Sequence, residues 1–166
     1  MKLFFLIALS LSLAFAGPKE KLEARGKQYD HIFLAAALKY SLSPDLLKSV
    51  GRTESGFVVD AVNVNSNGTI DRGIMQINSV HLTNDLTAED LFDPEINIHV
   101  GARILRACID RHGLTYKALN CYNGRITNNS YNIKVVANIE EGYFANMLYS
   151  RRPSNHEDVK GRIIKR

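Results

Sequence analysis

Two dipeptides, Ser43-Pro44 and Asp93-Pro94, set the points at which two helices of this chain begin. A serine or aspartate side chain caps free N–H groups at a helix start, and proline fits the first helical position because that position needs no N–H donor. The first helix should run from Pro44 to about Glu54, because Gly56 supplies a stop. The second should end before Gly113. Any fold must therefore accommodate these two helices and the segment between them.

The segment between the two helices has a different character. Residues 58–72 combine Asn, Ser, Gly and β-branched residues, with a tight-turn signal at Asn67-Gly68, so we predict a small hairpin. Apolar residues at helical spacing predict further helices near Lys27–Tyr40, Thr115–Tyr122 and Ile133–Met147. The predicted class is mainly α (α+β), with a small β insertion that divides the helices into two lobes. A cleft between the lobes is the expected place for a ligand.

The first 16 residues have the layout of a secretory signal peptide. Lys2 gives a basic start, Leu3–Phe15 is an apolar run, and Ala14-Phe15-Ala16 is a small-x-small cleavage site. An uncleaved membrane anchor is the alternative, but a spanning helix needs about 20 apolar residues. We predict cleavage after Ala16, export to the periplasm, and a mature chain without a transmembrane segment.

The positive charge of the chain is concentrated at one end. Of the net +4, residues 151–166 carry +4, and residues 17–150 sum to −1. With 45% hydrophobic residues, the chain can bury the core of one domain, and no basic groove points to nucleic acid. We expect a mobile polar lead-in over 17–28, a folded domain over 29–150, and a disordered basic tail over 151–166. Contact of the tail with an anionic wall polymer, a membrane surface or a partner is the alternative.

Glu54 continues an apolar stripe. Leu46, Val50 and Glu54 are spaced i, i+4, i+8 and lie on one helix face. Burial and the adjacent helix C-terminus both disfavour a negative charge there, so both raise the pKa of Glu54. A carboxyl that stays protonated near neutral pH can act as a general acid. Periodicity alone leaves open that Glu54 reaches solvent or pairs with Arg52 or Arg72.

Three motifs follow one another along the chain. They are Glu-Ser-Gly-Phe at 54–57, Gly-Ile-Met-Gln-Ile-Asn at 73–78, and Ala-Leu-Asn-Cys-Tyr-Asn-Gly at 118–124. Together they resemble the lytic transglycosylases, which cut the glycan strands of peptidoglycan, and the similarity spans roughly Phe33 to Leu148. The chain is most similar to the small specialised members that accompany secretion and pilus machines. The resemblance implies a lysozyme-like two-lobed fold and makes residues 29–150 a catalytic domain.

The resemblance also implies roles for individual residues. Glu54 would be the catalytic acid, oriented with the help of Ser55. The residues that would bind the glycan are Ser55, Met75, Gln76, Tyr122, Asn123 and Tyr143, the last as the late tyrosine that faces Glu54. Each has a structural alternative, namely a helix cap for Ser55 and core packing for Met75 and the two tyrosines. Two positions depart from the family pattern: Cys121 stands where an Ala precedes the Tyr-Asn pair, and Gly142 stands where an Arg often precedes the late tyrosine.

The implied chemistry needs one carboxyl group and no cofactor or metal. Glu54 would protonate the oxygen of the MurNAc–GlcNAc β-1,4 bond and then take a proton from the C6 hydroxyl, which leaves a 1,6-anhydro-MurNAc end. A lysozyme-type hydrolase is one alternative, and it would use a second carboxylate, Asp71, which could instead brace a turn. A non-catalytic peptidoglycan-binding module is the other. His81, His99 and His112 lack the spacing of a metal motif.

Two cysteines lie near the proposed cleft. Cys108 falls in the last turns of one predicted helix and Cys121 on the next, so an oxidising periplasm favours a disulfide between them. A pair of buried reduced thiols is the alternative. The bridge would hold Tyr122 and Asn123 beside the cleft. We expect a monomer that acts on peptidoglycan strands, in company with a secretion, pilus or flagellar apparatus.

Overall fold

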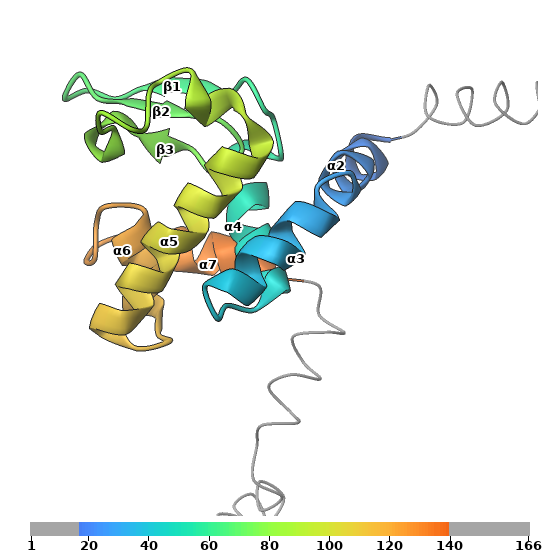
Figure 1. Ribbon diagram of the computed structural model, residues 1–166. Coiled ribbons are helices and arrows are strands. Elements are labelled where there is room, and N and C mark those ends of the chain that lie inside the picture. The colour runs from blue at the N-terminus through green and yellow to red at the C-terminus, as the bar shows by residue number, and fades with distance from the viewer. Residues whose placement is uncertain (1–16, 140–166) are drawn as a thin grey trace, which may run out of the picture.

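The computed structural model describes residues 17–139 (Figure 1). Its elements are α2 (Pro18–Lys27), α3 (Asp30–Lys39), α4 (Pro44–Ser55), β1 (Val62–Val64), β2 (Ile70–Arg72), β3 (Ile77–Asn78), the 3₁₀ turns η1 (Ser79–His81) and η2 (Asp90–Phe92), α5 (Pro94–His112), α6 (Tyr116–Tyr122) and α7 (Tyr131–Ala137). The predicted class, mainly helical with a small β insertion, is confirmed. The predicted signal peptide, the end of the last predicted helix and the basic tail lie outside the described residues.

Both predicted helix starts are capped as expected. The Ser43 Oγ accepts from the Leu46 N–H at 3.4 Å, and the Asp93 carboxylate accepts from the Ile96 N–H at 2.9 Å. Gly56 ends α4 with a φ of 62°, in the left-handed region that glycine adopts without a steric penalty. This stop matters for the site because it places Glu54 in the last turn of α4, beside the chain reversal into the β insertion.

The β insertion is a three-stranded antiparallel sheet in the order β1-β2-β3. The predicted Asn67-Gly68 turn joins β1 to β2, and Gly68 has a φ of 82°. The register places Asn63 and Asn78 on either side of Asp71. Strand β3 was not predicted, because a strand of two residues has no detectable alternation. The central position of Asp71 in this sheet determines its role below.

Residues Pro18–Lys27 form helix α2, whereas we expected a mobile lead-in over 17–28. Within α2, Glu23 forms an ion pair with Arg52 of α4 at 2.6 Å. Gly26 is buried, and a Cβ atom at that position would lie 2.6 Å from the ring of Phe57. The polar composition concealed this helix because no apolar stripe joins it to the body. Its contacts are the ion pair, the close approach at Gly26, a hydrogen bond from Arg25 to the Gly56 carbonyl, and the side chain of Leu22. The helix predicted over Lys27–Tyr40 begins later, at Asp30.

The core lies where α3, α4 and α5 meet the end of the sheet. Its largest fully buried apolar side chains are Phe33, Leu47, Val50, Phe57, Ile74, Met75, Ile77, Leu91, Ile98, Leu105 and Val135. The rings of Phe33 and Phe57 meet edge to face with centroids 5.9 Å apart, a favourable aromatic geometry. Two glycines, Gly51 of α4 and Gly101 of α5, leave room for the Met75 side chain between these helices.

Helix α5 connects the two parts of the molecule. It runs from the small sheet at one end to α6 at the other, and α3 packs beside it, while α7 packs against α4 and α6 (Figure 1). Sheet and helices thus meet along α5, and a ligand site between them can draw on both. Within residues 17–139, none of the helices has the length and hydropathy needed to cross a membrane.

Candidate active site

A cleft of about 780 Å³ lies between the sheet, α5 and the end of α6. One wall comes from the β1–β2 turn, β2, β3 and η1, and the other from residues 103–111 of α5. The end of α6 and its following turn, residues 121–124, contribute the rest, and Glu54 reaches the cleft from α4. This volume is in the range of sites that hold organic ligands. The cleft predicted between the two lobes is therefore present.

The Glu54 carboxyl is the most perturbed acid of the cleft. Burial raises its pKa from 4.5 to about 7, and the charge of Asp71 adds to the rise. A hydrogen bond from the Tyr131 hydroxyl to the Glu54 Oε1, at 2.5 Å, opposes the rise because it stabilises the carboxylate. The group therefore exchanges its proton near neutral pH. That is the property required of a side chain that first gives a proton and then takes one.

Tyr131 is the tyrosine that faces Glu54 in the described residues. We assigned this position to Tyr143, which lies outside them. Tyr131 begins α7 and is 6% exposed, and burial together with the Glu54 charge raises its pKa, so its hydroxyl stays a donor. Its ring stacks on that of Tyr122 with centroids 6.4 Å apart. The signal in the sequence is that Tyr131 stands four residues before buried Val135 and so continues the apolar stripe of α7.

Ser55 acts on the backbone around Glu54. Its hydroxyl donates to the Ile74 carbonyl at 2.8 Å and accepts from the Val58 N–H at 3.0 Å. The bond to Ile74 attaches the end of α4 to the segment between β2 and β3, and the bond from Val58 holds the turn that follows α4. Ser55 does not belong to the lining of the cleft. Its contacts therefore fit the orienting role expected for it, and they do not include a position for direct glycan contact.

Met75 is the clearest difference from the expected glycan-binding set. Its side chain is fully buried between α4 and α5 and does not line the cleft, so core packing, the alternative considered above, describes it. Its main chain connects to the site instead. The Met75 carbonyl accepts from the Tyr122 hydroxyl at 2.8 Å, which positions the Tyr122 ring at the cleft. The Met75 N–H donates to the Asn97 side chain at 2.7 Å.

Gln76 and Asn123 do line the cleft, as expected. The Gln76 backbone is in the left-handed region, with a φ of 47°, and its side-chain amide donates to the Gly73 carbonyl at 2.9 Å. Asn123 is exposed at the end of α6 and accepts from the Asn129 amide at 3.1 Å. With Tyr122, these residues bring three of the predicted binding side chains to one cleft with Glu54.

Asp71 lies in the sheet wall of the same cleft. Its carboxylate accepts from the side-chain amides of Asn78 at 2.6 Å, Asn65 at 2.9 Å and Asn63 at 3.3 Å. Asn63 and Asn78 are its cross-strand partners, so these bonds join all three strands. These contacts agree with the bracing role considered for Asp71 from the sequence. The charge of Asp71 also acts on Glu54.

Two buried asparagines that sequence analysis did not assign hold the site together. Asn97, 1% exposed on α5, donates to the carbonyls of Arg72 and Leu91 at 2.9 and 2.8 Å and accepts from Met75 as above. Asn120, 3% exposed on α6, accepts from the Asn132 N–H at 3.1 Å and thereby fixes the start of α7. An asparagine on an apolar helix face is the only sequence signal of such a residue, and it does not identify the backbone groups that it will bind.

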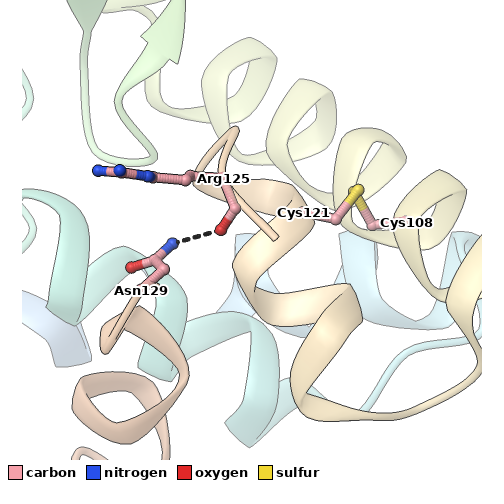
Figure 2. The surroundings of a disulfide bond; sticks show 4 residues. All are labelled: Cys108, Cys121, Arg125 and Asn129. Carbon is pink, nitrogen blue, oxygen red and sulfur yellow. Dashed lines mark hydrogen bonds between the residues drawn. A yellow bond between two sulfur atoms is a disulfide. The ribbon is translucent and has the colours of Figure 1, made fainter. Parts of the chain in front are cut away.

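The predicted disulfide joins Cys108 of α5 to Cys121 of α6 (Figure 2). Both cysteines line the cleft, next to Tyr122 and Asn123. Figure 2 also shows the Asn129 amide donating to the Arg125 carbonyl, at 2.7 Å, in the turn that leads to α7. The bridge therefore fixes the end of the cleft from which α6 contributes its side chains. Among residues 17–139, no three His, Cys, Asp or Glu side chains are grouped so as to hold a metal ion.

Comparison with known proteins agrees with this arrangement. The sequence profile of the transglycosylase SLT domain matches residues 31–141, more than half of the chain. Protein IpgF of Shigella flexneri is 37% identical over 93 residues, which cover 53% of this chain and 61% of that protein. X polypeptide of Escherichia coli is 32% identical over 97 residues, with shares of 55% and 57%. Invasion protein IagB of Salmonella typhi is 31% identical over 96 residues, with shares of 55% and 60%.

The matched region spans about three fifths of the length of these relatives. The profile covers Glu54, the sheet and the whole of α5, α6 and α7, which include the parts that build the cleft. The mainly helical architecture with its small antiparallel sheet agrees with the lysozyme-like fold that the resemblance implied. The chain belongs to the lytic transglycosylase family, through its transglycosylase SLT domain.

Proposed function

We propose that this protein cleaves the MurNAc–GlcNAc β-1,4 bond of peptidoglycan with Glu54 as its single acid and base. The observation that carries the proposal is the Glu54 carboxyl, which reaches the cleft with a pKa of about 7 and bonds to the Tyr131 hydroxyl at 2.5 Å. A group with this pKa is populated in both protonation states at neutral pH, so it can serve in both halves of the reaction.

In the first half, protonated Glu54 gives its proton to the glycosidic oxygen, and the bond from that oxygen to C1 of MurNAc breaks. The GlcNAc side leaves with a free hydroxyl, and the carbonyl oxygen of the MurNAc N-acetyl group stabilises the positive charge at C1. The Tyr131 hydroxyl then stabilises the Glu54 carboxylate, because a hydrogen bond to the charged form favours it.

In the second half, the Glu54 carboxylate takes the proton of the C6 hydroxyl of the same MurNAc. The C6 oxygen attacks C1, and the ring closes to a 1,6-anhydro-MurNAc end. Glu54 is protonated again, and no water is consumed. Tyr122, Gln76 and Asn123 are proposed to bind the sugars on either side of the cleaved bond, since all three line the cleft.

A lysozyme-type hydrolase with Asp71 as second carboxylate is the competing function. The observation in its favour is that Asp71 lines the same cleft and acts electrostatically on Glu54. Against it stand the three asparagine amides that bind Asp71, since a carboxylate held this way is poorly placed to move onto C1 of a sugar. We therefore propose the water-free reaction.

The place of action that we propose is the periplasm, reached by means of the predicted signal peptide of residues 1–16. The proposed role there is local opening of the wall for an envelope-spanning machine such as a secretion, pilus or flagellar apparatus. A relative whose name is invasion protein IagB supports this role, together with the resemblance to small specialised transglycosylases.

Digestion of purified peptidoglycan, followed by mass spectrometry of the released fragments, tests the proposal. The wild-type protein should release fragments with 1,6-anhydro ends. Glu54→Gln should lower the rate by about 10² to 10⁴. Glu89→Gln is the matched control, because Glu89 is exposed and lies outside the cleft lining, and it should keep the wild-type rate.

Other products would contradict the proposal in distinguishable ways. Fragments whose new ends have gained a water molecule would indicate the lysozyme-type hydrolase instead. Binding to the wall without any release of fragments, by the wild-type protein, would replace it with a non-catalytic binding module.

A further inference from the structure

Helix α5 carries three arginines whose surroundings differ. Arg106 forms an ion pair with Asp110, at 2.5 Å, on the side of the helix away from the cleft lining. Arg103 and Arg111 are exposed and line the cleft, and neither makes an ion pair or a hydrogen bond within residues 17–139. Two cationic side chains therefore stand at the cleft without an anion from the described part of the chain.

The two arginines lie in one row of the helix surface. Arg103, Ala107 and Arg111 are spaced i, i+4, i+8, and all three line the cleft. At 1.5 Å of rise per residue, the two arginine Cα atoms are about 12 Å apart along the helix. The small Ala107 side chain between them leaves the cleft surface open. The row offers two separate guanidinium groups along one edge of the site.

The opposite wall of the cleft has the opposite charge. It contains Asp71 and receives Glu54 from α4, whereas the α5 wall contains the two arginines. His81, which also lines the cleft, is close enough to Arg103 to have its pKa lowered by that charge, after the larger effect of burial. The cleft thus has Asp71 on its sheet wall and, on its α5 wall, two arginines that have no ion-pair partner within residues 17–139.

We propose that Arg103 and Arg111 bind carboxylates that project from the glycan, namely those of the stem peptides of peptidoglycan. The inference rests on the proposed function. A neutral sugar ring gives a guanidinium no anion to bind, and in an intact strand the lactyl carboxyl of MurNAc is consumed in its amide bond to the peptide. The carboxylates near the strand therefore belong to the peptide, and arginine binds carboxylates with charge-assisted hydrogen bonds. The α5 wall makes this site selective for peptide-bearing strands.

The experiment compares two soluble substrates with the same peptide. One is a peptide-bearing glycan strand, and the other is that strand after its peptide carboxylates have been converted to amides. The proteins are the wild type, Arg103→Gln/Arg111→Gln, Arg103→Lys/Arg111→Lys, and the matched control Arg106→Gln. Circular dichroism and thermal melting verify that each is folded. Both kcat/KM and the binding of fluorescent strands at low salt are measured.

On the unmodified strand, the double glutamine variant should lose about 2- to 30-fold in kcat/KM and in affinity, given the usual strength of two exposed ion pairs. On the amidated strand it should equal the wild type. The lysine variant should recover part of the loss, and Arg106→Gln should match the wild type on both substrates. High salt should remove most of the difference, because it screens exposed charges.

Equal binding of both strands by the wild type would overturn the inference, and so would an equal loss on both strands in the double glutamine variant. Failure of the proposed function looks different, since no variant would then release anhydro ends from either strand. The binding measurement still decides the role of the arginines in that case. A third substrate, stripped of its peptides, carries free lactyl carboxylates instead. An arginine effect on it as large as on the peptide-bearing strand would show that the peptide is not required and would contradict the proposed selectivity for peptide-bearing strands.

Discussion

Replacing Glu54 by Gln should stabilise the fold at the same time as it abolishes cleavage. The amide has nearly the shape of the carboxyl and can still accept from the Tyr131 hydroxyl, but it carries no charge at any pH. In the wild type, burial raises the pKa of Glu54 from 4.5 to about 7. The folded state therefore holds this proton more tightly than the unfolded chain does, and an ionised Glu54 opposes folding.

The size of the effect follows from the shift. One pKa unit corresponds to 1.36 kcal/mol, so a rise from 4.5 to about 7 corresponds to about 3 kcal/mol of unfolding free energy. Below pH 4.5 both states bind the proton and the penalty is absent. The free-energy cost of ionising Glu54 in the folded state grows as the pH rises from 4.5 to about 7, and it reaches its full size above pH 7. Relative to the wild type, Glu54→Gln should therefore gain about 1 to 3 kcal/mol between pH 4 and pH 8.

The assay is urea unfolding of the wild type, Glu54→Gln and Glu89→Gln at both pH values, under conditions that keep the disulfide intact. Taking the difference between the two pH values cancels contributions that do not titrate, such as altered packing of the amide. Glu89→Gln should show no comparable difference, because Glu89 is exposed. The reasoning would be refuted if Glu54→Gln and the wild type differed in unfolding free energy by the same amount at pH 4 and at pH 8. Glu54 would then ionise equally in the folded and the unfolded state.

Three further substitutions test the surroundings of Glu54. Tyr131→Phe should raise the pKa of Glu54, because it removes a hydrogen bond to the carboxylate, and it should lower kcat by about 10-fold. In the pH profile of the rate, the high-pH limb, near pH 7 in the wild type, should move to higher pH, and an unchanged profile would contradict this prediction. Asp71→Asn should move the same limb to lower pH, because a negative charge near Glu54 is lost, and it should lower the unfolding free energy measured in urea by about 1 to 3 kcal/mol. A variant of unchanged stability without activity would instead make Asp71 a catalytic partner. Cys108→Ser/Cys121→Ser should lose about 3 kcal/mol of unfolding free energy, since the bridge closes a loop with a sequence separation of 13. Equal stability of this variant and the wild type under oxidising conditions would contradict the prediction.

The helix boundaries were predictable because they depend on local chemistry. Caps, prolines and stopping glycines act within a few residues, and the starts of α4 and α5 were found from such signals alone. Helix α2 was missed because its contacts are made with residues of α4 and with Phe57, far along the chain. Local sequence patterns predict a helix when it buries an apolar stripe, and α2 has no such stripe.

The candidate site was predictable where a residue type itself carries the chemistry. Glu54 is an example, because a carboxyl at the end of an apolar row is unusual whatever surrounds it. Tyr131 and Met75 show the limit. Both are apolar or aromatic residues at buried positions, and only the tertiary structure determines that the Tyr131 hydroxyl meets Glu54 while Met75 contributes its backbone. The bonds of Asn97 depend in the same way on pairs of residues far apart in the sequence.

The contrast between Glu54 and Asp71 explains how a cleft with two carboxyl groups can use one acid. Asp71 receives three amide hydrogen bonds in the centre of the sheet, so its position is rigid. Within residues 17–139, Glu54 receives one hydrogen bond, from the Tyr131 hydroxyl, in a site where burial opposes its charge. The fixed charge of Asp71 raises the pKa of Glu54 further, so the braced carboxylate helps to keep the other one protonated. In the proposed reaction Asp71 would then contribute to acid catalysis through the pKa of Glu54 and without touching the sugar.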